Sequence, residues 1–134
     1  MFTVVGISGS LRSGSLNTML LRAAVEMMPP DSRLQILPIA AIPLYDGDVE
    51  AAGVPAAVNE AKAALMSAGA LLIVAPEYNG GIPGVAKNAL DWISRVPKQP
   101  LANKPVLIQS VSNGVLGGAR MQYHLRQVLV ALDA

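Results

Sequence analysis

A loop rich in glycine and serine contains the residues of this chain that are best suited to binding an anion. It runs from Gly9 to Asn17 and includes Ser10, Arg12 and Ser15. Because the loop precedes a predicted helix, its backbone N–H groups and serine hydroxyls can surround an oxyanion, and the Arg12 guanidinium can form two parallel hydrogen bonds to a phosphate. The alternative is an ordinary helix start in which Ser15 serves only as the N-cap residue.

Two common nucleotide-binding motifs are absent from this loop. It has no Gly-Lys-Ser/Thr sequence, which ends the phosphate loop of many nucleoside triphosphatases, and no Gly-x-Gly-x-x-Gly spacing, which marks dinucleotide-binding domains. The loop therefore excludes the usual forms of both protein classes.

A second loop, residues 76–84, has a composition suited to holding a flat ring. The glycine pair 80–81 allows close approach of the backbone, Tyr78 can cover a ring, and Asn79 offers both a donor and an acceptor. Taken alone, Glu77 could be an ordinary surface carboxylate. Two loops of this kind at neighbouring strand ends favour a binding site.

The elements that must position these loops alternate along the chain. Strands are predicted at 2–7, 34–37, 70–75 and 106–111, and helices at 15–28, from about 55 to 68, at 85–96 and at 121–132. The strand at 70–75 is apolar throughout and the strand at 106–111 is largely apolar, as expected when both faces of a sheet are covered. The segment 38–53 shows no clear periodicity. This order predicts an α/β fold with a parallel sheet between helices, and ligands at the carboxyl ends of its strands.

The composition excludes several other functions. The chain has 134 residues with no cysteine and one histidine, which rules out disulfide bonds, thiolate metal sites, cysteine nucleophiles and histidine-rich metal cages. Its ten basic and nine acidic residues form no basic stripe suited to nucleic acid. No apolar run is long enough to span a bilayer and the first residues do not resemble a signal peptide, so we expect no membrane partner and a cytoplasmic location.

The two loops, taken in order, resemble the NAD(P)H-dependent FMN reductase family, in particular its chromate- and quinone-reducing branch. The matching segments are Gly9-Ser10-Leu11-Arg12-x-x-Ser15-x-Asn17, Pro43-Leu44-Tyr45-Asp46, Pro76-Glu77-Tyr78-Asn79, Pro83-Gly84-x-x-Lys87-Asn88-Ala89-x-Asp91-Trp92 and Gly117-Gly118-Ala119-Arg120-x-Gln122-Tyr123-His124-Leu125-Arg126. The similarity runs from the first strand to the last residue.

The resemblance implies a flavodoxin-like three-layer α/β/α fold with strand order 2-1-3-4-5 and noncovalently bound FMN. It implies a phosphate site formed by Ser10, Arg12, Ser15, Asn17 and Thr18. It places the isoalloxazine ring, largely through main chain, against Pro76, Glu77, Tyr78, Asn79 and Gly80, with Val111 and Ser112 closing the far side.

The resemblance also implies the reaction. NAD(P)H would donate a hydride to the flavin N5, and quinones, free flavin, chromate or ferric complexes would accept the electrons, so that no catalytic side chain is needed. Family members form homodimers, often paired into homotetramers. The alternative is a flavodoxin-like electron carrier that does not oxidise NAD(P)H, but flavodoxins have strongly acidic surfaces whereas this chain has a net charge of +1.

Other chemically capable residues have structural interpretations. His124 is expected to be structural or to lie at an interface, and Trp92 and Ile93 are expected in the core or at a subunit contact. Two pairs have two interpretations each. Lys87 and Asn88 brace the flavin loop or lie on a solvated face, and Arg120 and Arg126 form intersubunit ion pairs or bind NADPH. Asp46 and Asp48 could suggest a metal site, but the sequence offers no further ligands beside them.

The length suffices for one domain but is short for a five-strand sheet of this kind. Four strands can be found, and the last predicted element is a helix near Ala134. We therefore expect a single FMN-binding domain over residues 1–134 that lacks a final strand and helix. Their absence would expose the edge of the fourth strand and an apolar helix surface.

Overall fold

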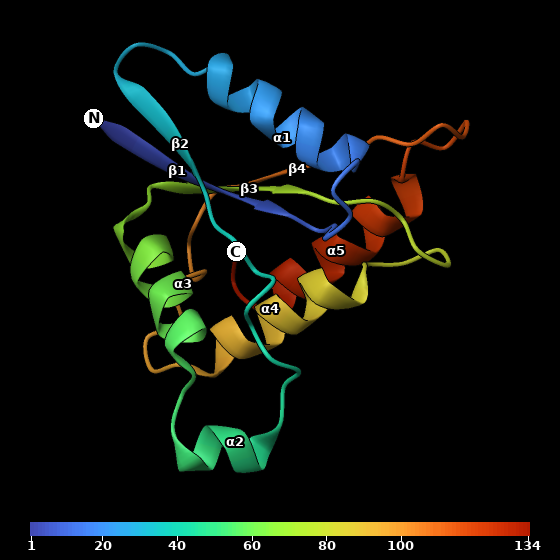
Figure 1. Ribbon diagram of the computed structural model, residues 1–134. Coiled ribbons are helices and arrows are strands. Elements are labelled where there is room, and N and C mark those ends of the chain that lie inside the picture. The colour runs from blue at the N-terminus through green and yellow to red at the C-terminus, as the bar shows by residue number, and fades with distance from the viewer.

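The computed structural model describes residues 1–134 and contains one parallel sheet of four strands (Figure 1). Its strands are β1 (Phe2–Ser8), β2 (Ser32–Ile36), β3 (Ala70–Val74) and β4 (Val106–Gln109). They lie in the order β2-β1-β3-β4 and every neighbouring pair is parallel. The predicted fold class and the order of these four strands are therefore confirmed.

Five helices surround the sheet: α1 (Leu16–Glu26), α2 (Gly47–Ala52), α3 (Ala56–Ser67), α4 (Gly84–Arg95) and α5 (Ala119–Ala131). Figure 1 shows α1 on one face of the sheet and α3, α4 and α5 on the other, while α2 stands away from the sheet. None of the helices combines the length and the apolar character needed to cross a membrane.

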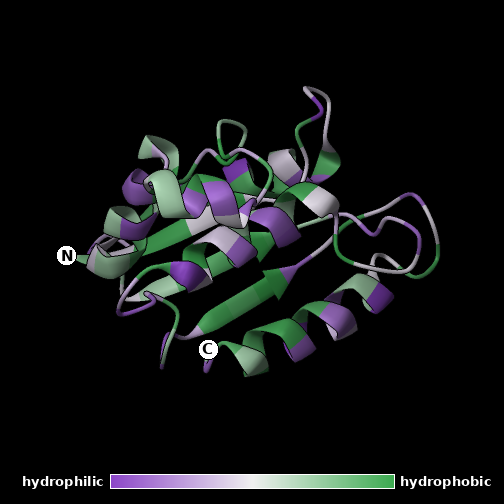
Figure 2. Cartoon of the chain, turned by 90° about the horizontal axis from the view of Figure 1, so that it is seen from below, coloured by the Kyte–Doolittle hydropathy of each residue, from purple (hydrophilic) through white to green (hydrophobic).

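The core is divided unequally between the two faces of the sheet. The larger cluster has 21 buried residues and packs the sheet against α3, α4 and α5, whereas the cluster under α1 has four, so most of the stabilising apolar burial lies on the three-helix side. Figure 2 shows the matching pattern: the strands in the middle of the sheet are mostly apolar, and the helices carry both apolar and polar residues. Trp92 and Ile93 are fully buried, as expected.

Several predicted boundaries and one predicted loop differ from the structure. The strand predicted at 34–37 spans residues 32–36, the helix predicted to reach residue 28 ends at Glu26, and the strand predicted to reach Val111 ends at Gln109, where its pairing with β3 stops. The last helix begins at Ala119, two residues before the first apolar position of its predicted face. The segment predicted to lack regular structure contains α2. Asp46 caps this helix by accepting a hydrogen bond from the Asp48 backbone at 2.9 Å, but six residues are too few to produce a visible helical period.

A close backbone approach holds the ends of β1 and β3 together. The Gly9 N–H donates to the Val74 carbonyl at 2.8 Å, and a Cβ on Gly9 would lie 2.5 Å from the Ala75 Cβ. No real Cβ contact is that short, so only glycine fits unless the two strand ends separate. The two loops singled out in the sequence therefore leave the sheet side by side.

Replacement of Gly9 by alanine tests this approach. We expect Gly9→Ala to lower the free energy of unfolding by about 1–3 kcal/mol because the methyl group has no space. Gly84→Ala is the matched control, since nothing lies within 4 Å of an added Cβ there. Urea denaturation should show the control within about 1 kcal/mol of wild type. Equal losses in both variants would contradict the steric explanation.

Candidate functional site

Three loops meet at the carboxyl edge of the sheet. They follow β1, β3 and β4 and cover residues 9–15, 75–83 and 110–118 (Figure 1). Because the strands are parallel and β3 lies between β1 and β4, all three loops leave the same edge next to one another. The sequence prediction that the first two loops lie together is confirmed.

The loop after β1 has the properties of an anion cradle. Ser15 is 3% exposed, caps α1 and accepts a hydrogen bond from the Thr18 backbone at 3.3 Å, and Ser10 is also buried. The backbone N–H groups of Leu16 and Asn17 have no acceptor within the chain. These free donors at the positive end of a helix dipole favour a negatively charged ligand.

The charge near this cradle is positive. Arg12 is exposed, makes no ion pair, and its guanidinium lies close to Gly14 within the same loop. A hollow of about 250 Å³ lies between this loop and the segment that follows β2, and Arg12 and Arg22 are the charged residues that line it. No carboxylate competes for the arginines.

Two of the residues predicted at the phosphate direct their side chains to other parts of the protein. The Asn17 side chain is 4% exposed and pairs with the Val111 backbone: Nδ2 donates to the carbonyl oxygen and Oδ1 accepts from the N–H, both at 3.0 Å. The Thr18 hydroxyl lies 2.7 Å from that of Ser8. Residue 17 can therefore bind an anion through its free backbone N–H group, because its side chain is engaged elsewhere.

The loop after β3 contains a two-residue hairpin turn. Tyr78 and Gly81 exchange backbone hydrogen bonds at 3.0 and 3.2 Å, and the residues between them have positive φ angles of 51° for Asn79 and 75° for Gly80. This Asn-Gly turn leaves the N–H groups of both central residues without an acceptor. Tyr78 is half exposed, and Pro76 is partly buried.

Glu77 has a role in the structure that the sequence did not reveal. Its Oε2 accepts from the backbone N–H groups of Arg120 and Met121 at 3.0 and 3.3 Å, and its Oε1 lies 3.7 Å from an Arg120 nitrogen. The carboxylate thus caps α5, whose N-cap residue Gly118 has no side chain to do so. The sequence did contain an indication of this role: Gly117 and Gly118 precede α5 and offer no side chain to cap it, so a cap must come from elsewhere in the chain.

The loop after β4 forms the opposite wall of a cleft. A space of about 300 Å³ separates it from the loop after β3, and the residues around this space are Glu77, Ser112, Gly114, Val115, Leu116 and Gly118. The Ser112 hydroxyl donates to the Gly114 carbonyl and accepts from the Gly114 N–H, and these two bonds form a turn within the loop. Val115 is fully exposed and Leu116 half exposed. Apolar side chains therefore stand at the mouth of the cleft.

Comparisons with known proteins identify the family. The family model described as NADPH-dependent FMN reductase matches residues 2–134. The chain belongs to this family. It is 54% identical to a quinone reductase of Escherichia coli (strain K12), covering 98% of this chain and 71% of the relative. It is 51% identical to an NAD(P)H-dependent FMN reductase of Pseudomonas aeruginosa, covering 97% and 70%.

A solved structure gives the same result for the fold. FerB, a flavoenzyme NAD(P)H:(acceptor) oxidoreductase from Paracoccus denitrificans, superimposes with a TM-score of 0.92 at 33% identity, covering 98% of this chain and 72% of that one. The flavodoxin-like arrangement predicted for this FMN reductase family member is therefore confirmed.

The remaining candidate residues of this family member lie in definite surroundings. Arg120 pairs with Glu77 of its own chain, and the Lys87 ammonium donates to the Asp91 carboxylate at 2.6 Å across one helical turn. His124 is exposed and lies against Gly81. No group of three or more histidine, cysteine, aspartate or glutamate side chains comes together as a metal site.

The long segment before α3 is fastened to α4 by side-chain hydrogen bonds. Asn88 Nδ2 and Trp92 Nε1 both donate to the Pro43 carbonyl, at 2.7 and 2.8 Å, and the Tyr45 backbone donates to Asn88 Oδ1 at 2.8 Å. Asn88 thus braces this segment rather than the loop after β3. These bonds lie along α4, away from the cleft.

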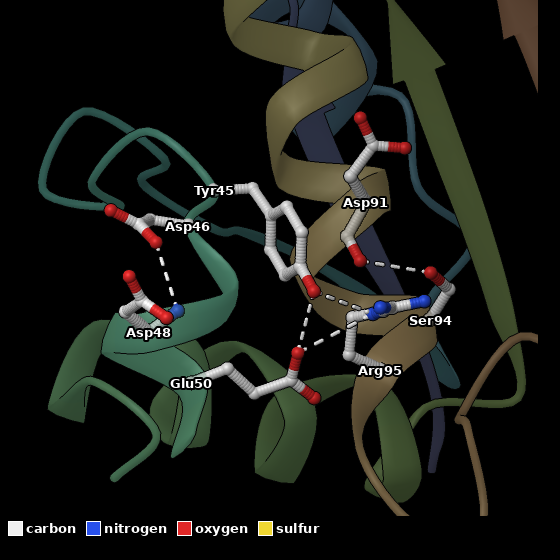
Figure 3. Close-up of polar contacts among 7 residues, drawn as sticks. All are labelled: Tyr45, Asp46, Asp48, Glu50, Asp91, Ser94 and Arg95. Atoms are coloured by element: carbon white, nitrogen blue, oxygen red, sulfur yellow. Dashed lines mark hydrogen bonds and ion pairs between the residues drawn. The ribbon is translucent and has the colours of Figure 1, made fainter. Parts of the chain in front are cut away.

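Three of the four side chains with altered pKa values, Tyr45, Glu50 and Arg95, contact one another near the C-terminal end of α4. The Tyr45 hydroxyl donates to Glu50 at 2.6 Å and accepts from Arg95 Nε at 3.0 Å (Figure 3). The hydrogen bond between Tyr45 and Glu50 raises the pKa of the tyrosine and lowers the pKa of the glutamate, and bonding to Tyr45 raises the pKa of Arg95. Separately, burial lowers the pKa of Lys104. None of these groups lines the cleft.

Replacement of Tyr45 by phenylalanine tests this cluster. The ring contact with Trp92 and the Arg95 guanidinium above the ring are retained, but the hydrogen bond that lowers the pKa of Glu50 is lost. We expect the pKa of Glu50 to rise in Tyr45→Phe, as followed by carbon-13 NMR of its carboxyl group. A carboxyl whose pKa is lower when folded stabilises the protein above its unfolded pKa and loses that contribution as pH falls through the folded value.

The stability difference between wild type and Tyr45→Phe should therefore be present at neutral pH and shrink in acid. Asp48→Asn is the control, because it changes an exposed carboxyl on α2, the helix that also carries Glu50. A stability difference that does not change with pH would show that the hydroxyl acts by packing alone.

Proposed function

We propose that this chain is an FMN-dependent NAD(P)H oxidoreductase that transfers electrons to quinones. The observation that carries the proposal is the placement of a carboxylate-free anion cradle beside a turn with free backbone donors, at one edge of a parallel sheet. A phosphate with a flat polar ring attached fits this pair of features. The names of the E. coli and Pseudomonas relatives support both the flavin and the quinone.

The phosphate end of FMN is assigned to the loop after β1. Ser10 and Ser15 supply hydroxyls, Arg12 supplies the charge, and the helix start at Asn17 and Thr18 contributes backbone. Arg12 has no carboxylate partner, so its full charge is available to a phosphate dianion.

The ring end of FMN is assigned to the cleft between the other two loops. Glu77 lines one side of this cleft and Ser112 the other. We assign to the ring the segment around Glu77, which is Pro76, Glu77, Tyr78, Asn79 and Gly80, together with Val111 and Ser112. When bound, the flavin supplies the redox chemistry by accepting a hydride and passing on the electrons. The free N–H groups of the Asn-Gly turn are suited to stabilising negative charge on the polar edge of the ring.

An electron carrier without NAD(P)H oxidation is the competing function. The net charge of +1 is unlike that of an acidic electron carrier, and the relatives reported above are named as reductases. A single FMN-binding domain over residues 1–134, a homodimer or homotetramer, a cytoplasmic location and chromate as a further acceptor remain part of the proposal.

The first experiment is the visible spectrum of the purified protein. A flavin spectrum, and its bleaching by NADPH or NADH without oxygen, is the expected result. Subsequent recovery of the spectrum on addition of a quinone would complete the proposed cycle. A protein that remains colourless after incubation with FMN would refute the proposal, and a yellow protein that neither nucleotide reduces would support the electron carrier.

Removal of the Arg12 charge should weaken the binding of FMN. We expect Arg12→Ala to raise the Kd of FMN about 10- to 100-fold, because a charge-assisted bond to phosphate is lost. His124→Ala should change the Kd by less than about twofold, since this exposed side chain lies outside the assigned cleft. Titration of the apoprotein with FMN, followed by flavin fluorescence, measures both. Equal effects would contradict the assignment of the phosphate.

The apolar mouth of the cleft should matter for the acceptor. We expect Leu116→Ser to raise the KM for a hydrophobic quinone about threefold to tenfold, because apolar contact at a half-exposed position is lost. The rate of anaerobic flavin reduction by NADPH should stay close to wild type. Val130→Ser, an exposed apolar position on α5, is the control. An unchanged KM would remove this residue from the acceptor site.

A further inference from the structure

The loop of residues 110–118 is held in place by two polar side chains, one from the first turn of α1 and one from the loop after β3. Beyond Gln109 this loop no longer pairs with β3, and its own hydrogen bonds lie within the loop or reach into α5. Its position relative to the rest of the cleft therefore depends on contacts from outside. Two residues supply them by hydrogen bonding, Asn17 and Glu77.

Asn17 fastens the start of the loop. Its side chain is buried, and both bonds of its amide go to the backbone of Val111, 94 residues away in the sequence. The amide therefore donates to and accepts from one backbone residue, as a neighbouring strand would, and gives the backbone just beyond the end of β4 the partner that β3 no longer provides. The same residue lies in the first turn of α1, directly after the anion cradle, so the cradle and the opposite wall of the cleft are joined through one side chain.

Glu77 fastens the end of the loop. A Cβ on Gly118 would lie 2.6 Å from the Ser110 hydroxyl, and the φ angle of Gly118 is 90°, so α5 has no room for a capping side chain of its own at this position. The carboxylate of Glu77 takes that place and bonds to two backbone N–H groups of the first turn of α5. A negative charge at this end of a helix is favourable, and the side chain is largely buried, which limits screening by solvent.

We infer that Asn17 and Glu77 are positioning residues that set the width and shape of the cleft in which the flavin ring is held. The inference deepens the proposed function and rests on it. The Asn17 side chain acts on the ring through the loop rather than on the phosphate, and the Glu77 carboxylate acts through α5 rather than on the flavin. The backbone of both residues remains available to the cofactor.

Comparison of FMN with riboflavin separates this role from phosphate binding, because riboflavin has the same ring without the phosphate. We expect Asn17→Ala to raise the Kd of both flavins about tenfold and to leave their ratio unchanged, since two buried backbone groups lose their partners and the wall moves. Arg12→Ala should raise the Kd of FMN alone. Asn59→Ala is the matched control, because it removes the bond from an asparagine of α3 to the Val54 carbonyl before that helix, and neither residue lines the cleft.

A graded series tests Glu77. Glu77→Gln keeps an oxygen acceptor for the helix start, whereas Glu77→Ala keeps none, so the alanine variant should bind both flavins more weakly than the glutamine variant. The visible circular dichroism of the bound flavin reports the surroundings of the ring, and it should change in Asn17→Ala and Glu77→Ala but not in Asn59→Ala. Thermal melts identify the temperature range in which every variant is folded, and all titrations are made within it.

Three outcomes would overturn the inference. A loss confined to FMN in Asn17→Ala would place its side chain at the phosphate. Unchanged affinity and unchanged circular dichroism in both Asn17→Ala and Glu77→Ala would show that the loop does not depend on these bonds. Binding of neither flavin by the wild-type protein would refute the proposed function itself and the inference with it, and this outcome is visible before any variant is made.

Discussion

Parallel pairing of β1 with β3 is the constraint on which the rest of the site depends. The register from Val4 opposite Ala70 to Ser8 opposite Val74 brings the two strands to the same end point, where Gly9 crosses next to Ala75. Since all strands run the same way, every loop with binding residues leaves at one edge. The segment after β2 begins at this edge too, and its helix α2 stands away from the sheet (Figure 1).

Hydrogen bonds, rather than ion pairs, organise that edge. Only 14% of the residues are charged, and one of the three ion pairs, Arg120 with Glu77, lies at the cleft. The buried Asn17 amide joins the start of α1 to the loop after β4, the Ser15 hydroxyl caps α1, and the Thr18 hydroxyl bonds to that of Ser8 at the end of β1. In a site of low dielectric such bonds are directional and costly to break, so they can hold loops that have little apolar contact. The arrangement leaves Arg12 uncompensated, which suits an anionic cofactor.

Much of the fold could be predicted from the sequence because its indications are local. The apolar run at 70–75 and the largely apolar segment at 106–111 identified covered strands, and Ser15 followed by helical spacing identified the start of α1. The helix α2 was missed because its six residues are shorter than the span over which helical periodicity can be seen. The end of β4 was placed two residues late because Val111 resumes the apolar character of the strand, although residues 110 and 111 no longer have a strand partner.

The sequence by itself determined which residues could bind a phosphate and a flat ring, because glycine, serine and arginine have those capacities wherever they are placed. Only the tertiary structure decided what the side chains of Asn17 and Glu77 do. Their partners are Val111, Arg120 and Met121, which lie 94, 43 and 44 residues further along the chain. Bonds over such separations exist only after the sheet has brought the loops together, so no local pattern of residue types can reveal them.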